Sequence, residues 1–204
     1  IAPSLVGSEM CIRDSIGCSR LGLNSALVTR VGDEHMGRFI REQLVREGVD
    51  TSHVKTDPDR LTALVILGIR DGERFPLVFY REDCADMAIE AADMDADFIA
   101  SARAVVVTGT HFSTDLVAGA SFTAMKMARQ SDRRVAFDID YRPSLWALGG
   151  HDDGESRFAE SERVTAHLQT VLPHCDLIVG TEEEWHIAGG CLLYTSDAAD
   201  EHGC

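Results

Sequence analysis

The stretch "VAFDIDYRPSLW", residues 135–146, joins an apolar run to a charged end. Its first half has the β-branched and aromatic residues that favour a buried strand. Asp138, Asp140 and Arg142 stand at the carboxyl end of that run, and Pro143 stiffens the chain beside the arginine. In an open α/β sheet, ligands bind just outside the carboxyl ends of the strands. We therefore expect these charged side chains to belong to a binding site.

On both sides of this stretch, strands alternate with helices. Apolar runs rich in β-branched residues predict strands, and apolar residues at helical spacing predict helices. We expect strands at residues 25–32, 104–109, 135–140 and 175–180, and helices at residues 33–48, 113–130, 158–171 and 181–190, after an earlier helix that ends at Gly22. The runs "AVVVTG" (104–109) and "CDLIVG" (175–180) are typical of parallel strands buried on both faces.

Two extended runs interrupt this alternation. "TALVILGIR" (62–70) and "RFPLVFYR" (74–81) are joined by a short segment containing Asp71-Gly72, a strong hairpin signal. An antiparallel hairpin inserted among β–α units indicates a small lid, at about residues 60–82. The order of elements predicts a three-layer α/β fold, a parallel sheet flanked by helices, with a β-hairpin lid.

The two ends of the chain differ from the middle. Residues 1–15 and 191–204 show neither a sustained helical period nor strand alternation. Both are similar to peptides that arise when sequencing-adapter DNA is translated at the edge of an assembled read. We expect a non-native leader at 1–15, a partial domain at 16–190 that is incomplete at both ends, and a non-native tail at 191–204. Ordinary disordered termini are the alternative.

Composition excludes several classes of protein. The net charge of −15 disfavours nucleic acid and anionic membrane surfaces as partners, because both are bound through Lys and Arg. No apolar run approaches the roughly 20 residues that span a bilayer, so we expect a cytoplasmic protein. The 6 cysteines include no C-x-x-C pair, which leaves a zinc or redox site without support. The glycine-rich dinucleotide, P-loop and H-E-x-x-H motifs are also absent from the sequence.

Two arginines are candidates for binding an anion. Arg81 follows Phe79 and Tyr80 at the end of the second hairpin run, where its guanidinium could hold a carboxylate through two hydrogen bonds. The alternative is a surface arginine that extends from the strand end into water. Arg142 is better placed, just beyond a sheet strand. Its alternative role is an ion pair with one of the preceding aspartates that only fixes the loop.

Other polar residues have simpler explanations beside the functional ones. Glu182, Glu183 and Glu184 open a helix, where carboxylates interact favourably with the helix dipole. Contact of one of them with magnesium is the sharper hypothesis. His111 follows the strand at 104–109 and could touch a ligand at the sheet edge, whereas His186 is expected only to pack.

Taken together, these segments resemble the ribokinase-like, or PfkB, family of carbohydrate kinases. The resemblance runs in the family's order through "RLGLNSALVTRVGDEHMGRFIREQLVREGVDTSHV", "TALVILGIRDGERFPLVFYREDCADMAI", "VVVTGTHFS", "FDIDYRPSLW" and "IVGTEEEWHIAGG". It implies that the hairpin covers a sugar and that Tyr80, Arg81, Asp140 and Arg142 bind it.

The resemblance also implies ATP and Mg²⁺ as cofactors of the full-length parent, which would be compatible with a homo-oligomer. Glu183 aligns with the glutamate of the family's Asn-x-x-Glu motif near the metal. Gly180 replaces the asparagine of that motif, and Asp140 stands where many relatives have asparagine. Of the motif near the metal, only Glu183 is therefore carried over to this chain.

The implied parent reaction is phosphorylation of a sugar acid, 5-dehydro-2-deoxygluconate, in inositol breakdown. The alternatives are a kinase of 2-keto-3-deoxygluconate or of fructose, and a non-catalytic module that binds a small anion. The family's sugar-binding Asp and Gly-Gly motif, and its Gly-x-Gly-Asp motif with the catalytic base, match no segment here. We therefore assign no catalytic residue and expect this chain to be inactive alone.

Overall fold

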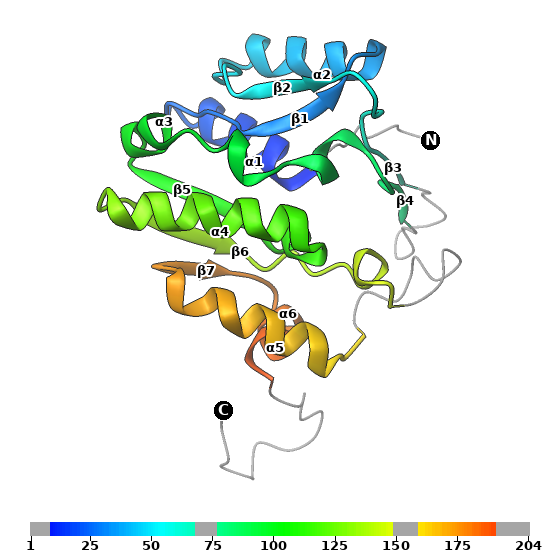
Figure 1. The fold of residues 1–204 in the computed structure, drawn as a ribbon, viewed down its shortest axis with the longest axis vertical. Helices are drawn as coiled ribbons and strands as arrows, with labels where there is room; N and C mark the ends of the chain where they lie inside the picture. Colours follow the sequence, from blue (N-terminus) through cyan, green and yellow to red (C-terminus); the bar gives the residue numbers. More distant parts are fainter. Residues whose placement is uncertain (1–8, 68–76, 149–158, 191–204) are drawn as a thin grey trace.

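The computed structural model describes residues 9–67, 77–148 and 159–190. Its α-helices are α1 (Glu9–Arg20), α2 (His35–Arg46), α3 (Ala96–Ser101), α4 (Asp115–Gln130), α5 (Glu162–Val171) and α6 (Glu182–Gly189). Its strands are β1 (Thr29–Gly32), β2 (Val54–Asp57), β3 (Leu64–Leu67), β4 (Leu77–Tyr80), β5 (Ala104–Thr108), β6 (Arg134–Asp138) and β7 (Leu177–Val179). Short 3₁₀ helices include η1 (Ala85–Ala88) and η3 (Gly109–Ser113). Figure 1 shows their arrangement.

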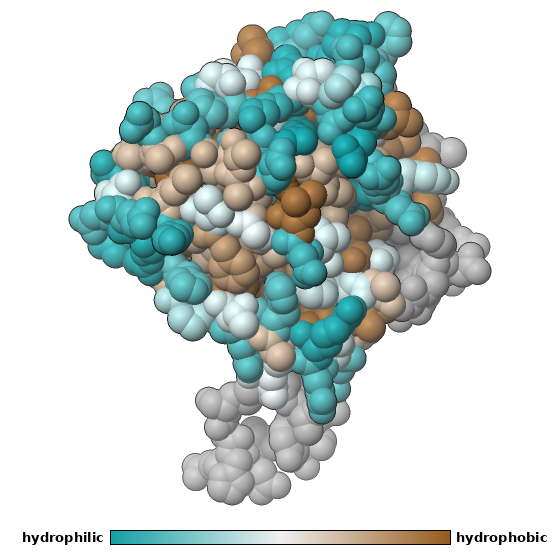
Figure 2. Space-filling view, viewed as in Figure 1, coloured by the Kyte–Doolittle hydropathy of each residue, from teal (hydrophilic) through white to brown (hydrophobic). Residues whose placement is uncertain are grey.

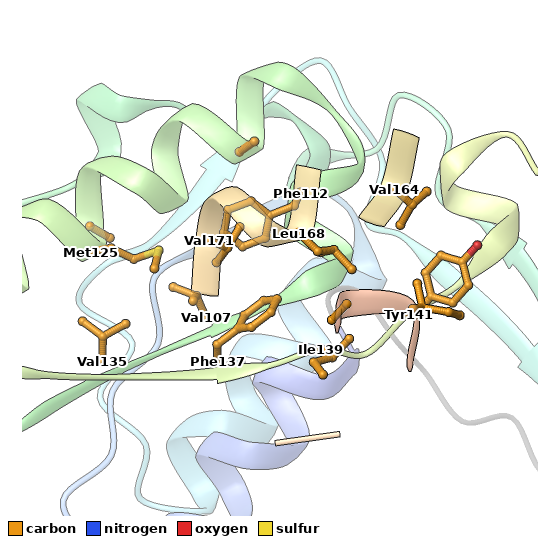
Figure 3. Packing of buried hydrophobic residues seen from close by; sticks show 14 of the residues in the cluster. Val107, Phe112, Met125, Val135, Phe137, Ile139, Tyr141, Val164, Leu168 and Val171 are labelled. Carbon is orange, nitrogen blue, oxygen red and sulfur yellow. The ribbon is translucent and has the colours of Figure 1, made fainter. Parts of the chain in front are cut away.

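The central layer is a parallel sheet in the order β5-β6-β7. Val107, Phe137 and Ile178 are register partners across it and point to the same face. On that face α4 and α5 bury the main core, in which Phe137 and Leu168 are at most 1% exposed (Figure 3). The blue helices α1 and α2 lie on the other side of β6 in the same view. This arrangement confirms the predicted α/β fold with a parallel sheet flanked by helices.

A second parallel pair, β1-β2, packs under α2, whose first turn is capped by Glu34. The hairpin is also confirmed, because β3 and β4 pair antiparallel with Val65 opposite Phe79. Its predicted Asp71-Gly72 turn lies outside the described residues. The helices expected at 33–48, 113–130, 158–171 and 181–190 are present as α2, α4, α5 and α6, whereas β2 and α3 were not predicted.

The prediction that two strands are buried on both faces is wrong. Val106 on β5 is 53% exposed, and Leu177 and Val179 on β7 are 57% and 51% exposed. These side chains alternate with those that face α4 and α5, so they point to the opposite face. An apolar run specifies strand formation but cannot show whether a second layer covers it.

The front face of the molecule is polar around its margin. In Figure 2, hydrophilic side chains cover α2, and side chains of low polarity gather in the middle around α3 and α4. The beginning of the chain also differs from expectation, because α1 starts at Glu9, inside the segment predicted to lack a helical period. Ile12 and Ile16 of α1 pack against the core beneath α2. Within residues 9–67, 77–148 and 159–190, no helix combines the length and apolar character needed to cross a membrane.

Candidate functional site

The carboxyl ends of β5, β6 and β7 meet at one edge because the strands are parallel. The chain packs tightly there: a Cβ atom on Gly109, just after β5, would lie 1.8 Å from the carbonyl oxygen of Ile139. Glycine at position 109 therefore lets the end of β5 approach the segment that follows β6. This close approach brings the polar residues of both strand ends together.

Asp140 lies at the centre of this edge and is 4% exposed. Thr108 donates a hydrogen bond to Asp140 Oδ2 at 3.3 Å, and Arg142 Nη2 lies 2.6 Å from Oδ1. The φ angle of Asp140 is 31°, which places its backbone in the left-handed region that Asn and Asp tolerate better than most residues. Such strain at a buried carboxylate is a feature of functional sites.

Glu184 holds the next part of the edge in place. Its Oε1 accepts a hydrogen bond from Tyr141 N at 2.9 Å, and its Oε2 accepts one from Thr181 N at 2.8 Å. Arg142, with a side chain 33% exposed, lies 3.9 Å from the same Oε1. The sequence analysis named Glu184 only as one of three carboxylates in the first turn of the helix, although Ile187 and Ala188 share its buried face of α6. That helical spacing was the available signal.

The lid residues take two different positions. Tyr80 ends β4 and is 57% exposed. Arg81, the next residue, is 6% exposed and its Nε donates to Asp86 Oδ2 at 2.6 Å. Arg81 is therefore a buried, paired arginine and does not extend into water. Asp86 was not singled out from sequence, although it is a lone carboxylate in the run "CADMAI".

Repulsion among carboxylates shapes the electrostatics of the edge. Burial, assisted by the charges of Asp140, Asp14 and Glu184, raises the pKa of Asp138 to about 6. The pKa of Asp140 is raised as well, by burial, and the charge of Arg142 opposes that rise. The positive charge of Arg142 offsets part of this negative charge.

Two neutral groups lie near the same edge. His111, in η3 after β5, is 8% exposed, and burial together with the charge of Arg81 lowers its pKa to about 3. Its imidazole is therefore uncharged at neutral pH. Burial and the charge of Asp14 raise the pKa of the Cys11 thiol, on α1, to about 12. The charges of Arg81, Asp140 and Asp138 also act on this thiol, and α1 contacts β5.

Of the residues predicted to bind substrate, three act on one another. Arg142 pairs with Asp140, and the charge of Arg81 also lowers the pKa of Asp140. Arg81 itself forms its ion pair with Asp86. Tyr80 is exposed at the end of β4, and Glu183 is half-buried on the first turn of α6.

The donor set fits a metal ion only weakly. In the parts of the chain that the structure describes, no three His, Cys, Asp or Glu side chains are placed to bind one ion. Mg²⁺ commonly retains several waters and binds through one or two carboxylates plus substrate phosphates. A single contact from Glu183 is compatible with that mode, but an all-protein site is not.

A parallel sheet with polar residues at its carboxyl edge, flanked by helices and carrying an antiparallel hairpin, is the architecture of ribokinase-like folds. Residues 15–201 match the family described as pfkB family carbohydrate kinase. The chain belongs to this family.

Individual relatives agree with this assignment. The chain is 34% identical over 172 residues to a 5-dehydro-2-deoxygluconokinase of Geobacillus kaustophilus, covering 84% of this chain and 48% of the relative. The crystal structure of a PfkB protein from Polaromonas sp. JS666 superposes with a TM-score of 0.76 at 27% identity, covering 88% of this chain and 57% of that one. A sugar kinase from Pyrococcus horikoshii in complex with ATP gives a TM-score of 0.75 at 22% identity, over 91% of this chain and 56% of that one, and shows the fold alone. The chain spans about half the length of the curated relatives it matches.

Proposed function

We propose that this chain is the sugar-acid-binding part of an ATP-dependent kinase that phosphorylates 5-dehydro-2-deoxygluconate in inositol catabolism. Family membership supports a carbohydrate kinase, and the name carried by the Geobacillus kaustophilus relative supports this particular sugar acid. A kinase acting on an acid rather than a neutral sugar needs a cation at the substrate. The proposal therefore depends on the arginines of the carboxyl edge.

The observation that carries the proposal is the position of Arg142 beside Asp140 at the carboxyl edge. Arg142 contacts its carboxylate at 2.6 Å, and the charge of Arg81 acts on the same group. Arg142 is partly exposed, so its remaining donors are accessible to a ligand. A guanidinium recognises a carboxylate or a phosphoryl group through paired hydrogen bonds. We assign Tyr80, Arg81, Asp140 and Arg142 to substrate binding.

In the proposed enzyme, the residues of this chain position the substrate. Phosphoryl transfer depends mainly on positioning and electrostatic stabilisation. Arg142 would hold the acid or stabilise the transferred phosphoryl group, and Asp140 would fix the orientation of Arg142. Bound together with ATP, a magnesium ion would neutralise phosphate charge. Glu183 is the proposed protein contact for that ion, through one carboxylate.

A kinase assay tests this function. A protein extended to the length of the relatives is expected to phosphorylate 5-dehydro-2-deoxygluconate in preference to 2-keto-3-deoxygluconate and fructose. The 204-residue chain alone is expected to give no phosphorylated product. A preference for fructose by the extended protein would contradict the sugar-acid assignment. Turnover by the chain alone, with contaminating kinases excluded, would contradict its proposed inactivity.

A further inference from the structure

The buried ion pair between Arg81 and Asp86 makes one of the two hydrogen bonds of a closed arginine–carboxylate fork. The two side chains are 6% and 1% exposed, so neither can complete its bonding with bulk water. Arg81 Nε donates to Asp86 Oδ2 at 2.6 Å. Arg81 Nη2 and Asp86 Oδ1 are buried and have no hydrogen-bond partner within the described residues.

A second arginine pair in the same molecule shows what the closed arrangement looks like. Arg30 donates from Nε to Asp93 Oδ2 at 2.7 Å and from Nη2 to Oδ1 at 2.9 Å. This fork uses both donors on one side of the guanidinium and both carboxylate oxygens. In the Arg81–Asp86 pair the same fork is open, with one donor and one acceptor left over. Buried polar groups without partners are uncommon, and each costs free energy.

The two unpaired atoms determine which chemical group can bind between them. That group must accept a hydrogen bond from Arg81 Nη2 and donate one to Asp86 Oδ1. A hydroxyl group does both, as does a water molecule, whereas a carboxylate or a ketone cannot donate and an ammonium group cannot accept. Since the charge of Arg81 acts on Asp140 and on His111, the fork lies near the carboxyl edge of the sheet.

We propose that Arg81 and Asp86 together bind a hydroxyl group of the sugar acid, and that Asp86 is a specificity-determining residue. This inference rests on the proposed function, and it assigns the two arginines to different groups of the substrate. Arg142, which is partly exposed, takes the negatively charged group of the substrate. Arg81 is buried together with Asp86 and binds a neutral hydroxyl through its unpaired Nη2.

Two matched probes test the inference by isothermal titration calorimetry on the 204-residue chain. The first is 5-dehydro-2-deoxygluconate. The second, 5-oxohexanoate, has the same carbon chain, carboxylate and ketone but no hydroxyl group. The wild-type chain is expected to bind the hydroxylated probe about 10- to 100-fold more tightly than 5-oxohexanoate, because hydrogen bonds to charged groups contribute affinity of that size.

Asp86→Asn is expected to reduce this preference to about threefold or less, because the amide cannot supply the charged acceptor. Glu82→Gln is the matched control. Glu82 is exposed and lies four residues before Asp86, so its replacement also removes one negative charge. This variant is expected to keep the full preference for the hydroxylated probe. If Asp86→Asn does not fold, Arg81→Lys replaces it, since lysine keeps the charge but lacks the second donor of the fork.

Equal affinity of the wild-type chain for both probes would overturn the inference and leave the anion site intact. An unchanged preference in Asp86→Asn, with only a lower melting temperature, would overturn it too, because the pair would then serve the fold alone. Failure of both probes to bind at about 10 mM would contradict the proposed function itself. The outcomes thus separate the two proposals.

Discussion

Replacing Asp138 with asparagine tests the electrostatics of the carboxyl edge. The carboxyl of Asp138 has a pKa of about 6, raised from 3.8 by burial and by Asp140, Asp14 and Glu184. That difference corresponds to about 3 kcal/mol between the ionised and protonated states. Because the side chain is only partly buried, solvent screening reduces the expected cost of its charge to about 1 to 2 kcal/mol.

The sign of the effect follows from proton binding. Between about pH 4 and pH 6 the folded chain binds more protons at Asp138 than the unfolded chain, so this residue makes stability fall as pH rises. Above about pH 6 the full cost is present, and below about pH 4 it is absent. The asparagine side chain that replaces it carries no charge at any pH. Asp138→Asn is therefore expected to be more stable than the wild type by about 1 to 2 kcal/mol at about pH 8 and equally stable at about pH 4.

Urea unfolding at several pH values, followed by circular dichroism, measures this difference. Asp59→Asn, which changes an exposed aspartate in a turn, is the control and is expected to change little at either pH. A stability difference for Asp138→Asn that does not depend on pH would refute the electrostatic explanation. Loss of stability at about pH 8 would refute it as well.

Three further predictions concern the fold that carries the site. Gly109→Ala is expected to lose about 2 to 4 kcal/mol in urea unfolding, because its Cβ would collide with the Ile139 carbonyl at 1.8 Å; a loss below about 0.5 kcal/mol would contradict the close packing. The side chain of Thr181 caps α6 by accepting a hydrogen bond from Glu184 N, so Thr181→Ala is expected to lower the free energy of unfolding by about 1 kcal/mol in the same assay. An unchanged unfolding midpoint would count against the cap. Leu177→Lys is expected to reduce self-association in light scattering, because Leu177 is 57% exposed on an apolar strand; a wild-type chain that is already monomeric would contradict this.

The helix at the end of the site was predictable from local sequence. "TEEEWHIAGG" shows a capping threonine, acidic residues in the first turn and a glycine after the last, and α6 has each of these. The same segment also contains the spacing that buries Glu184 beside Ile187. Attention to a family motif pointed to Glu183, whereas helical phase points to Glu184.

Unlike α6, the pairing of Arg81 with Asp86 could not be predicted from local sequence. The two residues are close in sequence, but the turn of η1 and the burial of both side chains arise from packing in the whole domain. The sequence shows only that a carboxylate interrupts an apolar run, which is unusual for a buried segment. Its partner and its open hydrogen bonds are consequences of tertiary structure.

Exposure of the sheet was not predictable for a similar reason. Val106 and Leu177 belong to apolar runs that read as fully buried strands. Whether the second face is covered depends on elements distant in sequence. The strands themselves, their parallel order and the edge where their carboxyl ends meet followed from periodicity and from the rules of α/β folds.

The central claim is that Arg142 binds a negatively charged substrate group at the carboxyl edge. Calorimetric titration of the wild-type chain and Arg142→Ala with 5-dehydro-2-deoxygluconate and with fructose tests it most directly, with Arg134→Ala, whose side chain is 79% exposed, as the control. We predict that the wild-type chain and the control bind the acid more tightly than fructose, and that Arg142→Ala weakens acid binding by about 10- to 100-fold without affecting fructose. Equal binding of the acid by the wild type and Arg142→Ala would contradict the account.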